Sequence, residues 1–104
     1  MIAERPVPVD MRALRLLRRS PMALDYYTWL TYRYSYLRKP TTVPWEAQHA
    51  QFGADYGRLR DFRSKAIEAL AKVHRVYPDA RFDAAQAGLT LRPSPTHIPR
   101  LRSG

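Results

Sequence analysis

The feature that most constrains the fold is a long apolar stripe in the second half of the chain. Its members recur at spacings of three and four residues: Leu59, Phe62, Ala66, Leu70, Val73 and Tyr77. This period is that of one face of an α-helix of about five to six turns, and Pro78 would end the helix. Because such a face is stable only when other elements cover it, the stripe predicts a packed domain.

Start and stop signals divide the rest of the chain into further helices. Asp10, Ser20 and Asp55 are residue types that cap helix N-termini. Gly53 is predicted to end a helix in the left-handed conformation. A second apolar stripe is expected before it, formed by Ala23, Tyr27, Leu30, Tyr34 and Leu37. The predicted helices are about 10–19, 21–37, 44–52 and 55–77.

Three short strands are expected around the last two helices. Residues 41–43 are β-branched and lie between two prolines. Residues 80–84 and 89–91 predict a hairpin with a turn at 85–88. A strand before a helix-turn-helix and a hairpin after it is the order of a winged helix, so we expect a mainly α, α+β fold of this type.

The length of 104 residues fits one domain. We expect it to cover residues 1–93, with a flexible basic tail over 94–104. The core should centre on Leu24, Tyr27, Leu30, Leu59, Phe62, Leu70 and Val73.

The absence of cysteine excludes disulfides and thiolate metal sites, and it fits a reducing compartment such as the cytoplasm. The sequence contains neither an apolar run of about 20 residues nor a signal-peptide core. A membrane partner is therefore not expected.

The charge favours a polyanionic partner. Lysine and arginine number 18 against 9 acids, which gives a net charge of +9. Because much of this charge is patterned on predicted helices, double-stranded DNA is preferred as the partner over a merely solubilising surface.

The last predicted helix carries basic residues at its start. On a helical wheel Arg60 and Ser64 point away from the apolar stripe, where they would face base edges, while basic neighbours would reach phosphates. Asp61 would accept from a cytosine amine or pair with Lys65. The hairpin would add Arg81 and Arg92 at the flanking backbone. The alternative is a solvated face with ion pairs. The expected DNA-binding residues are Arg58, Arg60, Arg63, Ser64, Lys65, Arg81 and Arg92.

Two other clusters have less specific interpretations. The aromatic run of the second helix is expected to pack mainly in the core. Stacking on unpaired bases stays open for it, and Tyr32 and Tyr36, off the main stripe, are the best surface candidates. The first helix carries Arg12, Arg15, Arg18 and Arg19, which would extend a phosphate-binding surface, contact an acidic protein, or form a charged outer face.

No catalytic constellation is expected. The histidines, His49, His74 and His97, lack the close spacing of a metal pair, and His49 and His97 are expected to be ordinary surface residues. The sequence has neither a glycine-rich phosphate loop nor a recognisable triad order. We expect no enzyme activity, no metal and no cofactor.

Three segments carry a family resemblance: LDYYTWLTYRYSYLRKP, PWEAQHAQFGADYGRLRDFRSKAIEALAKVHRVYPDA and LTLRPSP. They resemble the C-terminal domain of the RepA family of plasmid replication initiators, over roughly Pro8 to Pro99. The resemblance implies a bacterial winged-helix domain of a mobile element that binds repeated sites at a plasmid origin.

One departure from the family opens an alternative function. Members of the family are usually much longer and carry an upstream domain, whereas a methionine stands here just before the resemblance begins. A truncation, a cloned domain and a natural stand-alone relative are the alternatives. The last would dock on another protein complex as a regulator or inhibitor, for example of host defence.

Overall fold

The structure is a computed structural model that describes residues 10–53 and 55–94. Within these residues it contains helices α1 (Met11–Leu17), α2 (Pro21–Tyr34), α3 (Trp45–Phe52) and α4 (Leu59–Val76), and strands β1 (Thr41–Pro44), β2 (Arg81–Ala84) and β3 (Gly88–Arg92). The α+β class with a hairpin is confirmed, and the order of elements is compatible with a winged helix. Nearly all of the expected basic tail lies outside the described residues.

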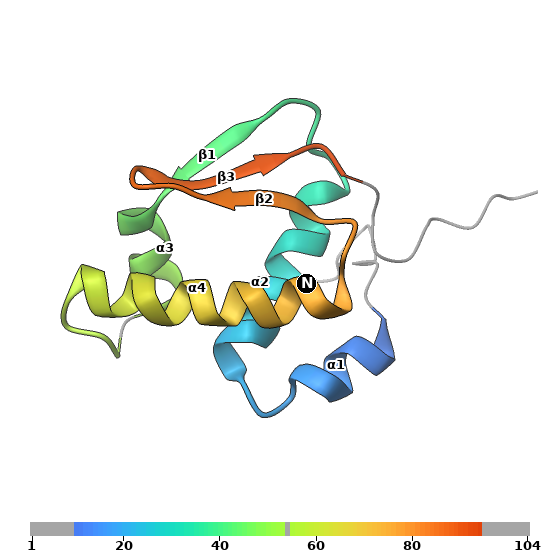
Figure 1. Ribbon diagram of the computed structural model, residues 1–104, viewed down its shortest axis with the longest axis horizontal. Helices are drawn as coiled ribbons and strands as arrows, with labels where there is room; N and C mark the ends of the chain where they lie inside the picture. Colours follow the sequence, from blue (N-terminus) through green and yellow to red (C-terminus); the bar gives the residue numbers. More distant parts are fainter. Residues whose placement is uncertain (1–9, 54, 95–104) are drawn as a thin grey trace, which may run out of the picture.

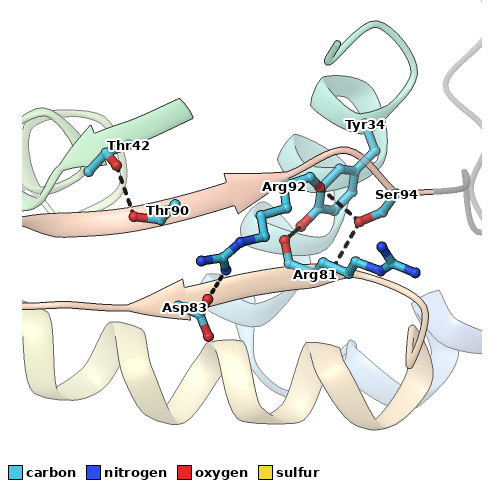
Figure 2. Close-up of polar contacts among 7 residues, drawn as sticks. All are labelled: Tyr34, Thr42, Arg81, Asp83, Thr90, Arg92 and Ser94. Carbon is cyan, nitrogen blue, oxygen red and sulfur yellow. Dashed lines mark hydrogen bonds and ion pairs between the residues drawn. The ribbon is translucent and has the colours of Figure 1, made fainter. Parts of the chain in front are cut away.

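The strands form an antiparallel sheet in the order β1-β3-β2, which lies over α4 (Figure 1). In the central strand, Leu89 and Leu91 are fully buried against the helices. Thr90 lies between them on the outer face, where its hydroxyl hydrogen-bonds with that of Thr42 at 2.8 Å (Figure 2). This alternation gives the sheet one apolar and one polar face.

The two predicted apolar stripes form the centre of the core. In α4 every stripe residue is buried except Leu59, which is half-buried at the helix start. In the α2 stripe only Leu37, beyond the end of the helix, is half-buried. Leu24 is also half-buried, so two of the seven expected central residues lie at the edge of the core.

Two predictions about the connection between α3 and α4 were wrong. Gly53 has φ −124°, which is not left-handed. Its importance is steric, because a Cβ built on it would lie 2.2 Å from Cδ1 of Phe62. Nor does Asp55 cap α4, which begins at Leu59 with Arg58 at the N-cap. The chain turns before the helix, since the Tyr56 N–H donates to the Gly53 carbonyl at 2.9 Å.

In the part of the chain that the structure describes, no helix combines the length and apolar character needed to cross a bilayer.

Candidate nucleic-acid interface

The start of α4 is fixed by packing against α3. The His49 ring stacks on Phe62, with centroids 5.2 Å apart and planes inclined by 22°. Its Nε2 also hydrogen-bonds with the Tyr56 carbonyl at 2.6 Å. His49 is therefore a half-buried packing residue, and the expectation that it is an ordinary surface residue was wrong. His97 lies outside the described residues.

The outward face of the first turns of α4 is polar and basic. Arg58, Arg60 and Ser64 are exposed, and the side chain of Arg60 is 79% exposed. The Arg60 Nε lies 3.9 Å from an oxygen of Asp61. An ion pair at this distance between two exposed side chains is weak. The cation is thus available to an incoming anion.

Lys65 lies on another side of α4. Its Nζ is 3.8 Å from Glu68, so the expected pair with Asp61 is not formed. It lines a cavity of about 420 Å³ that also borders the start of α2, where Asp25 contributes a negative charge. Because acids and bases share this cavity, it shows no single preference for anions.

Arg63 connects α4 to α3 and the hairpin. Its guanidinium carbon lies 5.8 Å from the centroid of the Trp45 ring, which is within cation–π range. Its Nε is buried and has no hydrogen-bond partner in the structure. Trp45 in turn donates its Nε1 hydrogen to the Ala85 carbonyl at 2.8 Å. The tip of the hairpin is therefore tied to the start of α3, where the Trp45 ring also contacts Arg63 of α4.

Arg81 and Arg92 lie at the other end of the hairpin. They are direct partners in the ladder between β2 and β3, at its base. Arg92 pairs with Asp83 on the outer face of the sheet, and the Tyr34 hydroxyl donates to the Arg81 carbonyl at 2.8 Å (Figure 2).

The expected site therefore divides into two groups. The five residues of α4 and its N-cap lie at the N-terminal end of that helix, with Lys65 turned toward the cavity beside α2, whereas Arg81 follows the far end of α4. That helix has 18 residues and is about 27 Å long. Gln86 is the exposed polar side chain of the turn at the tip, and it was not among the expected DNA-binding residues. The turn predicted at 85–88 already included Gln86.

The aromatic run of α2 is divided by burial. Tyr26, Tyr27 and Tyr34 are buried, which confirms core packing for them, whereas Tyr32 and Tyr36 are exposed as expected. Burial raises the pKa of Tyr34 to about 12. Burial also raises the pKa of Tyr26, whose hydroxyl donates to Gln48 Oε1 at 2.7 Å.

Within residues 10–53 and 55–94, no group of three or more histidine and acidic side chains is arranged to hold a metal ion.

One comparison with known proteins gives a match. The family model described as plasmid encoded RepA protein matches residues 1–48, a part that includes α1, α2, β1 and the first half of α3. The resemblance to the RepA family is thereby confirmed over those residues. No curated protein and no solved structure matches the chain.

Proposed function

Because residues 1–48 match the RepA family of plasmid proteins, we propose that this domain serves plasmid replication by binding duplex DNA at origin repeats, without catalysing a reaction. The DNA-binding residues would be those expected from the sequence, with Gln86 added at the hairpin tip.

One observation carries this proposal. The first turns of α4 present Arg58, Arg60 and Ser64 to solvent, and the hairpin tip is tied to Trp45 of α3, whose ring also contacts Arg63 of α4. An exposed helix with cations and a short hydroxyl side chain can enter a major groove, while an adjoining hairpin contacts the backbone.

The roles divide by direction. Arg60 lies two positions before Phe62, which places it about 160° around the helix axis from that buried ring. Its guanidinium would therefore point toward base edges. Arg58, at the N-cap, would contact a phosphate, as would the outer nitrogens of Arg63. Lys65 lies about 140° around the axis from Arg60, so it would contact only a phosphate at the border of the groove.

The competing function is docking on another protein complex. The exposed face of α1 favours it, because Met11 and Leu16 are 62% and 73% exposed among the arginines of that helix. Such a surface suits an acidic partner with apolar side chains. It makes no use of the outward face of α4, so the two functions predict different behaviour toward DNA.

The test begins with selection from random duplexes in about 150 mM salt, where non-specific phosphate contacts are weakened. We expect an enriched sequence. Arg60→Ala should then weaken binding to that sequence by roughly 1–3 kcal/mol and relax its sequence preference.

Arg75→Ala is the matched control, because it removes the same exposed charge from the last turn of the same helix. It should weaken all duplexes slightly and leave the sequence preference intact. A selection that returns no enriched sequence, together with binding lost at moderate salt, would reject specific recognition and favour the protein-docking function.

A further inference from the structure

Two exposed tyrosines lie at the C-terminal end of α2, one in its last turn and one two residues beyond it. Tyr32 and Tyr36 are 52% and 46% exposed. Their rings meet edge to face, with centroids 5.3 Å apart and planes inclined by 74°. Single exposed aromatic residues are ordinary, but two adjoining rings, each about half exposed, form an aromatic patch.

Three cations, Arg33, Arg38 and Lys39, lie close in sequence to these two tyrosines. The Arg33 guanidinium carbon lies 4.9 Å from the centroid of the Trp29 ring. Arg33 therefore lies on the side of α2 that carries Trp29. Arg38 and Lys39 follow in the exposed segment after α2. Residues 26–45 contain no aspartate or glutamate, so the patch has no acid of its own segment to neutralise it.

The patch faces away from α4. Tyr32 lies two positions from both Leu30 and Tyr34, which puts it about 160° around the axis from each of these buried residues. Tyr34 contacts Tyr77, just after α4, with ring centroids 5.8 Å apart. Figure 1 shows α2 crossing behind α4, so the outward faces of the two helices are on opposite sides of the domain.

We propose that this patch binds single-stranded DNA, as a surface separate from the α4 interface. The patch consists of Trp29, Tyr32, Arg33, Tyr36, Arg38 and Lys39. Exposed aromatic rings stack on the faces of unpaired bases, and neighbouring cations bind the phosphates between them. Bases in a duplex already stack on one another, so the tyrosines favour an unpaired strand. This proposal extends the proposed function but depends on different residues.

The experiment uses the full chain and fluorescence anisotropy with an oligothymidylate of about 12 nucleotides. A second probe has the same phosphates but lacks bases. We expect the base-containing strand to bind about tenfold or more tightly than the abasic strand. The double variant Tyr32→Ala, Tyr36→Ala should remove this difference, whereas Tyr32→Phe, Tyr36→Phe should retain it because both rings remain.

Separate measurements distinguish failure of this proposal from failure of the α4 interface. The double alanine variant should bind duplex DNA within about twofold of the unchanged chain, because stacking on unpaired bases is not used there. Arg60→Ala should have the reverse effect, weakening duplex binding alone. If the double variant lost its cooperative melting, Tyr36→Ala alone, beyond the last residue of α2, would provide the same comparison.

Two results would overturn the proposal. The first is equal affinity for the base-containing and abasic strands, which would show that only charge attracts DNA to this side. The second is tighter binding of an oligouridylate of the same length, which would assign the patch to RNA.

Discussion

Close contact, rather than backbone conformation, accounts for the glycine between α3 and α4. Three atoms of the Phe62 ring lie within 2.9 Å of the position that a Cβ on Gly53 would occupy. The same ring stacks on His49 and is fully buried. A side chain at Gly53 would displace this packed ring, so the orientation of α4 on α3 depends on the absence of one there.

Gly53→Ala should therefore destabilise the domain by about 1–3 kcal/mol, because the added methyl group displaces a packed ring. Urea unfolding measures this change. Gly57→Ala is the matched control, since a Cβ there meets nothing within 4 Å. It should be neutral or stabilise by up to about 1 kcal/mol through the unfolded chain. Equal stability of the Gly53 variant and the unchanged chain would mean that Phe62 relaxes freely, against this account.

The hairpin of β2 and β3 is held at both ends by side chains of the helices. At its tip the Trp45 indole donates to the Ala85 carbonyl, and at its base the Tyr34 hydroxyl donates to the Arg81 carbonyl. Both acceptors are backbone carbonyls of the hairpin. These two contacts therefore do not depend on the identity of the hairpin side chains. The cations of the base, Arg81 and Arg92, are thereby kept away from those at the start of α4.

This separation has a consequence for DNA of different lengths. If Arg81 and Arg92 bind phosphates, they reach a part of the duplex about 27 Å, or about eight base pairs, from the contacts of Arg60. Replacing both by alanine should then lower the slope of log affinity against log salt by about two on a 20-base-pair duplex. On a duplex of about eight base pairs that carries only the α4 site, the same variant should bind unchanged. An unaltered slope on the long duplex would remove the hairpin base from the interface.

In the molecule as a whole, a small core is built largely from phenol rings. Tyr26, Tyr27 and Tyr77 are fully buried, and Tyr34 nearly so. Burial is the main cause that raises the pKa of each of these hydroxyls above the ordinary value of 10.0. Each phenol is therefore easier to ionise in the unfolded chain than in the folded domain.

The sign of the pH dependence follows. Below about pH 10 these tyrosines are neutral in both states, and their contribution to stability is complete. Between about pH 10 and 12 the unfolded chain loses protons first, so stability should fall as pH rises. Thermal melting between about pH 9 and 11 would measure this fall.

Tyr34→Phe should lower stability by about 1 kcal/mol at neutral pH through the lost hydrogen bond, and it should also reduce the alkaline fall. Tyr32→Phe is the control, because it removes an exposed hydroxyl and leaves the buried ones in place. A melting temperature that stays constant up to about pH 11 would contradict the burial of these hydroxyls.

Local patterns in the sequence determined the elements and most of the core. Spacings of three and four placed the apolar faces of α2 and α4 correctly, because helical periodicity is a property of neighbouring residues. The hairpin, with its turn between 84 and 89, followed in the same way from a change of period and a glycine.

Only the tertiary structure decided which side chains share a surface. The ladder of β2 and β3 sets Arg81 against Arg92 at the base of the hairpin. The Trp45 contact sets Ala85 beside the start of α3, and Gly53 is required by a ring nine positions later in the chain. These relations join residues that are distant in sequence. They depend on how the sheet and helices pack, and no local period records that packing.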